Sequence, residues 1–224
     1  MSGWGEFISA FVVFFLSHAI PVRPPVKGRI VAQIGARGFT LGYSILSTAI
    51  LIWLIVAAGR APFVVLWNAP FWGPVVTLFV MFDVVMLLAL TIGRPNPFSF
   101  GGAHNERFDP SHPEVVRFLR HPLLVGLALW AVAHIVPNGD LAHVILFGAF
   151  AGVALLGMAI INRRKRRQMG DEAYEALLAQ TRAATWCPAP QARRAVIGRL
   201  AIGAVAYVGL VALHGPVIGV YPWP

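Results

Sequence analysis

Apolar residues along this chain gather into six long runs, separated by shorter stretches that are rich in charged residues, glycine and proline. A window of about 19 residues, the length used to find membrane spans, places the runs at residues 5–22, 38–58, 73–92, 122–137, 142–162 and 195–214. Most of them approach the roughly 20 residues that a helix needs to cross a bilayer. The pattern therefore predicts an all-α fold: a polytopic transmembrane bundle of six helices that forms a single domain over residues 1–224.

The connection between the third and fourth runs is long and irregular. It extends from Gly93 to Arg120 and contains four prolines, which prevent a continuous helix through its first two thirds. Residues 113–120 are expected to form a short helix with proline in its first turn. Because loops of this length are uncommon in compact domains unless they have a function, we expect the segment to fold back over the mouth of the bundle.

The connection after the fifth run begins with a basic stretch from Asn162 to Arg167 and continues as an amphipathic segment. One helical face of this segment is apolar, and its members are Met169, Ala173, Tyr174, Leu177, Leu178 and Trp186. Such a pattern is typical of a helix that lies along the membrane surface with its apolar face in lipid. Glycines four residues apart, at Gly38 and Gly42 and again at Gly148 and Gly152, predict close packing between helices.

Composition and charge placement agree with membrane insertion. Mean hydropathy is +0.71, and only 12% of residues are charged. All but one of the 18 basic residues lie on three alternate connections, and only Arg60 lies on the other side. By the positive-inside rule these connections are cytoplasmic, which places both termini outside and makes the amphipathic helix a cytoplasmic interfacial helix. The net charge of +9 is thus explained by orientation, and no nucleic-acid partner is expected.

Three further features limit the class of protein. Trp4, Trp67, Trp72 and Trp223 fall near the predicted outer interface, where amphipathic rings prefer to lie. The first run lacks the basic start and small-residue cleavage pattern of a signal peptide, so it is expected to be a retained span. Cys187 is the single cysteine, which excludes intramolecular disulfides, cysteine-based metal sites and c-type haem attachment. A redox metal would therefore depend on histidine.

Five of the seven histidines lie inside the apolar runs or at their ends: His18, His121, His134, His143 and His214. Because an ionisable side chain is costly in hydrocarbon, such residues usually face a bundle interior, a cavity or a cofactor. Predicted depth in the membrane, taken alone, allows His18 and His121 to share a ligand near the cytoplasm. It likewise allows His134 to share one with His214 or His143 near the outer side. A pair of His18 and His134 requires the fourth helix to be tilted or displaced. His104 and His112 belong to the polar loop and are expected to be solvated.

Asp83 is the only acid deep inside a predicted span. It is predicted either to orient a ligand histidine by accepting its ring N–H or to make an interhelical hydrogen bond. Asn138, Gly139 and Asp140 are predicted to form the turn between the fourth and fifth helices.

Several motifs in order resemble the NnrU family: SHAIPVR, NPFSFGG, RHPLLVGLALWAVAHIVPNGD, the basic run before MGDEAYEAL, and HGPVIGVYP. This family is named for an association with nitrite and nitric oxide metabolism in denitrifying bacteria, and it is related to the plastid 15-cis-ζ-carotene isomerase. The resemblance implies a haem b protein of the bacterial inner membrane, with His18 and His134 as the axial ligands and His121 as the next candidate. In the isomerase branch a cysteine precedes the histidine that matches His134, whereas this chain has Ala131.

A shorter resemblance supplies a rival hypothesis. Arg120-His121-Pro122, together with the acidic helix after the fifth run, is similar to the cofactor region of isoprenylcysteine carboxyl methyltransferases, which bind S-adenosylmethionine. Three functions therefore stay open. They are a haem b protein that isomerises a lipophilic polyene or serves redox metabolism of nitrogen oxides, a membrane methyltransferase, and a non-enzymatic assembly or sensor subunit with a protein partner. The predicted cofactor-binding residues are His18, His134, His121, His214, Arg120 and Asp83.

Overall fold

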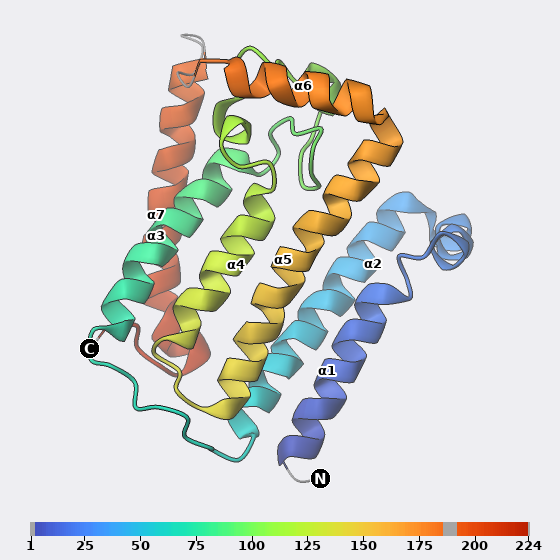
Figure 1. Ribbon diagram of the computed structural model, residues 1–224. Coiled ribbons are helices and arrows are strands. Elements are labelled where there is room, and N and C mark those ends of the chain that lie inside the picture. The colour runs from blue at the N-terminus through green and yellow to red at the C-terminus, as the bar shows by residue number, and fades with distance from the viewer. Residues whose placement is uncertain (1–2, 186–191, 224) are drawn as a thin grey trace. The chain divides into compact units, whose positions relative to one another are not determined.

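The computed structural model describes residues 3–185 and 192–223, so Trp186 and Cys187 lie outside the described residues. Within these ranges the protein is α-helical, with no β-strand and with one isolated bridge between Val65 and Asp140. The helices are α1 (Gly3–Ala19), α2 (Pro24–Arg60), α3 (Gly73–Thr91), α4 (Pro122–Ile135), α5 (Leu141–Met169), α6 (Asp171–Ala183) and α7 (Arg193–Ile218), with the 3-10 turns η1 (Asn105–Arg107) and η2 (Glu114–Arg117) in the long loop (Figure 1).

Each predicted span corresponds to a helix of the structure. In the described part of the chain, α2, α3, α5 and α7 are long and apolar enough to cross a membrane. The other two apolar helices, α1 and α4, have 17 and 14 residues. Since a helix rises about 1.5 Å per residue and the hydrocarbon core is about 30 Å thick, both of these helices are shorter than that core. The all-helical fold is confirmed, with four spans of full length.

The chain divides into two compact units. Unit 1 contains residues 1–67 and 139–146, and unit 2 contains residues 68–138 and 147–224. In unit 1, α1 packs along α2. Glu6 near the start of α1 accepts a hydrogen bond from Trp53 Nε1 at 3.3 Å and pairs with Arg60 at 3.5 Å. Its partners both lie in the last two turns of α2, so these polar contacts join one end of the two helices.

The helix α2 begins earlier than its apolar run. Its first part starts at Pro24, which occupies the favoured first turn. Gly35 then interrupts the helix with φ 75° and ψ 166°, a conformation open to glycine. The basic residues Lys27 and Arg29 therefore lie on a short helical segment before the kink, and the apolar run follows it.

The loop after α2 is fastened to the turn before α5. The backbone N–H groups of Leu66 and Trp67 donate to Gly139 O at 2.7 and 3.1 Å, and Leu141 N–H donates to Val64 O at 2.9 Å. A Cβ atom at position 139 would lie 2.0 Å from Trp67 O. Glycine is therefore required here by the close approach of two backbone segments.

In unit 2, α3 packs against both α4 and α7. Thr77 Oγ1 donates to Ala133 O of α4 at 2.9 Å, and Tyr207 OH of α7 donates to Leu78 O at 3.0 Å. A Cβ at Gly126 would lie 3.3 Å from Leu88, and one at Gly203 would lie 3.0 Å from Ala89. These two glycines allow the helices to approach closely.

The glycine pairs singled out from the sequence have a different environment. A Cβ added at Gly42, Gly148 or Gly152 would have no neighbour within 4 Å among the described residues, and at Gly38 it would meet only Ile34 of the same helix. The prediction that these glycines mediate close helix packing was wrong for the contacts described here. Spacing alone does not reveal which side of a helix faces a neighbour.

The helix α6 lies across one end of unit 2, above the ends of α3 and α4 (Figure 1). Its residues Tyr174 and Leu178 are buried and form a core with Phe98 and Val116 of the long loop. The apolar face that was predicted to lie in lipid is thus largely used inside the protein. The long loop does fold back as expected, and the predicted helix at residues 113–120 is the 3-10 turn η2.

Candidate functional site

Three histidines of the apolar helices share one hydrogen-bonding arrangement. His18 Nδ1 lies 2.7 Å from Phe14 O, His134 Nδ1 lies 2.7 Å from Trp130 O, and His214 Nδ1 lies 2.6 Å from Val220 O. A carbonyl oxygen can only accept, so Nδ1 carries the proton in each ring. In a neutral imidazole Nε2 is then the nitrogen with a lone pair, which is the form that binds a metal.

His134 lies near the end of α4 within an aromatic environment. Its ring is 5.4 Å from that of Trp130 and 5.2 Å from that of Phe147. Asn138 Nδ2 donates to His134 O at 2.7 Å and so satisfies a carbonyl at the end of the helix. The side chain is therefore held by neighbours from α4, α5 and the connecting turn.

His214 is oriented by the motif that follows it. Gly219 ends α7 in the left-handed conformation, with φ 87°. The chain then turns back, so that Val220 O reaches His214 and the ring of Tyr221 lies over Gly215, where a Cβ would be 2.5 Å from Tyr221 Cε1. His214 also lies within electrostatic range of His134. The structure thus places these two predicted residues in one region of unit 2, while His18 belongs to unit 1.

His143 has a carboxylate partner that sequence reasoning did not identify. Asp140 is buried, and its Oδ2 lies 2.7 Å from His143 Nδ1. Its Oδ1 accepts from the backbone N–H of His143 at 3.2 Å, as an N-cap residue does. Asp140 was predicted only as a turn residue, although an acid three residues before a histidine at a helix start is a signal that could have revealed the pair.

Asp83 lies on α3 with an exposed side chain. In unit 2 the Nδ1–H groups of His134 and His214 are donated to main-chain carbonyls, and neither has Asp83 as its partner. The structure therefore offers no contact for the predicted role of Asp83 in orienting a histidine.

Arg120 and His121 belong to a closed polar network at the other end of unit 2. His121 is buried, with Nε2 2.9 Å from Asn162 Oδ1 and Nδ1 3.0 Å from Ser99 Oγ. Asn162 Oδ1 also accepts from Tyr174 OH, which in turn accepts from Arg120 Nη1, both at 3.0 Å. The amide oxygen must accept from His121, so Nε2 carries the proton and Nδ1 accepts from Ser99.

The network has a structural consequence. Both ring nitrogens of His121 are engaged, and the guanidinium group of Arg120 is bound to α6. His121 lies in the loop, one residue before α4, where burial lowers its pKa and the nearby charge of Arg120 acts in the same direction. These residues fasten the long loop to α5 and α6.

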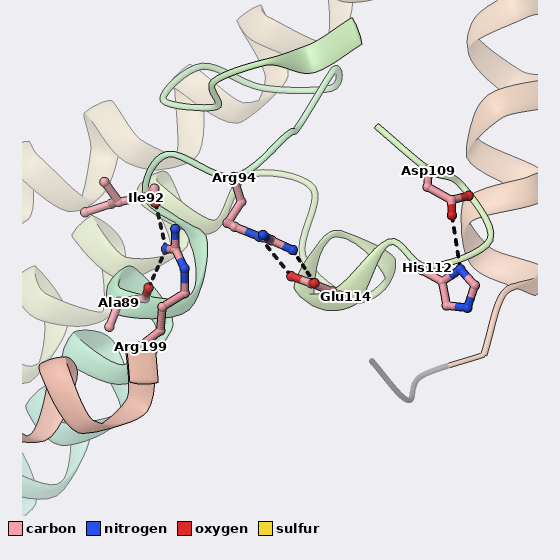
Figure 2. A network of polar contacts seen from close by, with 7 residues as sticks. All are labelled: Ala89, Ile92, Arg94, Asp109, His112, Glu114 and Arg199. Carbon is pink, nitrogen blue, oxygen red and sulfur yellow. Dashed lines mark hydrogen bonds and ion pairs between the residues drawn. The ribbon is translucent and has the colours of Figure 1, made fainter. Parts of the chain in front are cut away.

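Ion pairs hold the rest of the long loop (Figure 2). Arg94 pairs with Glu114, with Nε 3.2 Å from Oε2. His112 Nδ1 lies 3.0 Å from Asp109, and the hydrogen bonds from Ser111, followed by that of His112, lower the pKa of Asp109 to about 2. Arg199 of α7 donates to the carbonyls of Ala89 and Ile92, both at 2.9 Å, and thus satisfies the end of α3.

A cavity of about 190 Å³ lies within this loop, lined by Arg94, Asn96, Glu114 and Leu123 among other residues. Small-molecule sites usually enclose about 300–1,000 Å³, so this cavity is smaller than an S-adenosylmethionine site needs. Among its charged lining residues, Arg94 and Glu114 form an ion pair with each other.

The donor chemistry fits a haem better than a multi-ligand metal site. Within residues 3–185 and 192–223, no group of three or more His, Cys, Asp or Glu side chains could hold a metal ion. Haem iron takes only one or two protein ligands, and neutral imidazoles are common among them. In His134, His214 and His18 the nitrogen held by a main-chain carbonyl is Nδ1, which leaves Nε2 as the nitrogen that can face a metal.

An all-helical fold with four full-length apolar helices, and with ionisable side chains held inside apolar segments, defines a membrane protein. The family model described as NnrU protein matches residues 6–222, nearly the whole chain. This protein therefore belongs to the NnrU family. No curated protein and no solved structure gave a significant match in the corresponding comparisons.

Proposed function

We propose that this NnrU-family protein is a multi-pass protein of the bacterial inner membrane that holds haem b through intramembrane histidines. Six spans with both termini outside are part of the proposal, and charge placement supports them. The observation that carries the haem assignment is the shared state of His18, His134 and His214, in which a main-chain carbonyl holds Nδ1–H. This arrangement makes Nε2 the ligand atom without any further change of tautomer.

His134 is the first residue that would hold the haem. Family resemblance implies it, and its ring is packed between aromatic neighbours that limit its motion. Two residues, His18 and His214, are candidates for the second residue that would hold the haem. His18 is implied by resemblance, whereas His214 is favoured by its location in the same unit and within electrostatic range of His134.

Bound haem would supply a Lewis-acid or one-electron centre whose properties depend on its axial ligands. The protein's own residues would hold the imidazoles in one tautomer and keep water away from them. Trp130 and Phe147 provide the apolar surroundings of His134. The proposed reaction is isomerisation of a lipophilic polyene or electron transfer linked to nitrogen-oxide metabolism. Position 131 is alanine, so a thiolate does not contribute there.

The test is the visible spectrum of protein purified from cells supplied with haem. Wild type is expected to show a Soret band and a pyridine haemochrome of haem b. His134→Ala should lose most of the bound haem, because the substitution removes the proposed ligand. The second ligand is whichever of His18→Ala and His214→Ala shifts or removes the band.

His104→Ala is the matched control, since His104 is an exposed loop residue whose ring nitrogen faces only Glu106 at 3.5 Å. Its spectrum should equal that of wild type. Colourless wild-type protein under full haem supply, or equal haem content in all four variants, would contradict the proposal.

The methyltransferase alternative gains no support from the arrangement of Arg120 and His121. Both side chains are already bonded to Tyr174, Asn162 and Ser99, and the neighbouring cavity is small. Calorimetric titration with S-adenosylmethionine at millimolar concentration should show no binding. The assembly or sensor alternative predicts that cells keep the wild-type phenotype when all five intramembrane histidines are changed.

A further inference from the structure

The helix α3 has three faces, of which two are covered by neighbours in unit 2. Thr77, Val84 and Leu88 face α4, where Thr77 bonds to Ala133 O and the other two lie beside Gly126. Phe82 and Ala89 face α7, where they lie against Tyr207 and Gly203. With about 3.6 residues per turn, the remaining face is centred on residue 83.

This third face is apolar apart from one carboxyl group. Val76 and Phe79 are exposed, with 41% and 71% of their surface accessible, and Leu87 and Leu90 are half-buried. Asp83 lies between them and is exposed. It is ten residues from the first residue of α3 and eight from the last, which corresponds to about 15 Å and 12 Å along the axis. The carboxyl group is therefore near the middle of the span.

Such a group requires a partner in hydrocarbon. An acid at the centre of a span is costly to insert, and such residues usually face another helix or a cavity. In the part of the chain that the structure describes, no hydrogen bond or ion pair reaches Asp83. The Nδ1–H groups of His18, His134 and His214 are already donated to main-chain carbonyls, so these donors are committed elsewhere.

A second copy of the same face satisfies this requirement. A carboxyl group that carries a proton donates through its O–H and accepts through its other oxygen. It is therefore complementary to itself. Two copies inserted in the same orientation are related by a two-fold axis along the membrane normal, and each residue near that axis then faces its own counterpart.

We propose that this protein forms a homodimer through the third face of α3, with Asp83 facing Asp83 of a second copy and Val76, Phe79, Leu87 and Leu90 packing around the pair. Interhelical hydrogen bonds in membranes contribute only modestly to helix association, so packing of these four apolar side chains supplies the remaining stabilisation. The carboxyl pair fixes how the two copies of α3 align along their length, because Asp83 is the one polar residue among the five that define this face.

Cysteine cross-linking in native membranes tests the face. In a Cys187→Ser background, Phe79→Cys and Leu87→Cys lie one turn on either side of Asp83 and should form intermolecular disulfides on mild oxidation. Val84→Cys and Ala89→Cys are matched controls on the covered faces of the same helix and should not. Equal cross-linking from both pairs, or cross-linking to a different protein, would overturn the proposal.

Dilution of labelled protein in liposomes tests the carboxyl pair. Asp83→Asn keeps a donor and an acceptor, and its dimer dissociation constant should stay within about threefold of wild type. Asp83→Leu keeps the helix apolar and should weaken the dimer about tenfold, as expected for losing one to two interhelical hydrogen bonds. A protein that stays monomeric at every protein-to-lipid ratio, or a dimer that Asp83→Leu leaves unchanged, would refute the assignment. Circular dichroism shows whether each variant is folded.

Discussion

At the residue scale, main-chain carbonyls orient three of the histidines in the apolar helices. For His18 and His134 the accepting carbonyl belongs to the residue four positions earlier on the same helix, and helix geometry places that carbonyl close to the imidazole. In His214 the carbonyl comes from Val220, after the chain has turned back at Gly219. Local helix geometry alone can thus orient two of the rings, whereas the third depends on a turn.

A single methyl group at Gly139 is expected to destabilise the protein. In Gly139→Ala the new Cβ would lie 2.0 Å from Trp67 O, so the backbone must move, at a cost of about 1–3 kcal/mol. Thermal unfolding in detergent should therefore begin at a lower temperature. Gly148→Ala is the control, because its Cβ has no neighbour within 4 Å among the described residues and alanine favours a helix by about 0.5–1 kcal/mol. If Gly139→Ala unfolds at the same temperature as wild type, the close contact between Gly139 and Trp67 is absent.

At the element scale, α6 and the long loop stabilise each other. The buried ring of Tyr174 packs against Phe98 with centroids 5.6 Å apart, while its hydroxyl group joins Arg120 to Asn162. Apolar packing and the polar network thus meet at one side chain. The amphipathic pattern predicted the helix correctly, but its apolar face had two candidate partners, lipid and protein, which periodicity cannot distinguish.

The attachment of α6 should weaken on acidification because of His121. Its folded-state pKa lies below the ordinary value of 6.5, so the unfolded state binds more protons between these two values. Stability is therefore complete above about pH 6.5 and is lost as the pH falls toward the folded-state pKa. Limited proteolysis of the α5–α6 junction should be faster at pH 5.5 than at pH 8.

In His121→Gln the side chain cannot gain a proton, so the proteolysis rate should depend less on pH, although it is higher overall because a hydrogen bond worth about 1 kcal/mol is lost. His104→Gln, at an exposed position, should retain the pH dependence of wild type. An identical pH profile in wild type and His121→Gln would exclude His121 as its cause.

At the scale of the whole molecule, orientation follows from charge. The loop between α2 and α3 is predicted to lie outside and the loop between α3 and α4 inside. In a Cys187→Ser background, Asn68→Cys should react with a membrane-impermeant thiol reagent on intact spheroplasts. Glu106→Cys should react only after the membrane is opened, because both positions are exposed and are predicted to lie on opposite sides of the membrane. The reverse labelling pattern would invert the proposed topology.

The sequence by itself determined where the apolar helices lie, because the length and hydropathy of a span are properties of consecutive residues. It also determined the NnrU family, since its motifs extend over nearly the whole chain. Only the tertiary structure decided which partner each polar group has. Asn162 is 41 residues from His121, and Arg120 is 54 from Tyr174. Periodicity cannot specify contacts between residues so far apart, because they depend on how the helices pack.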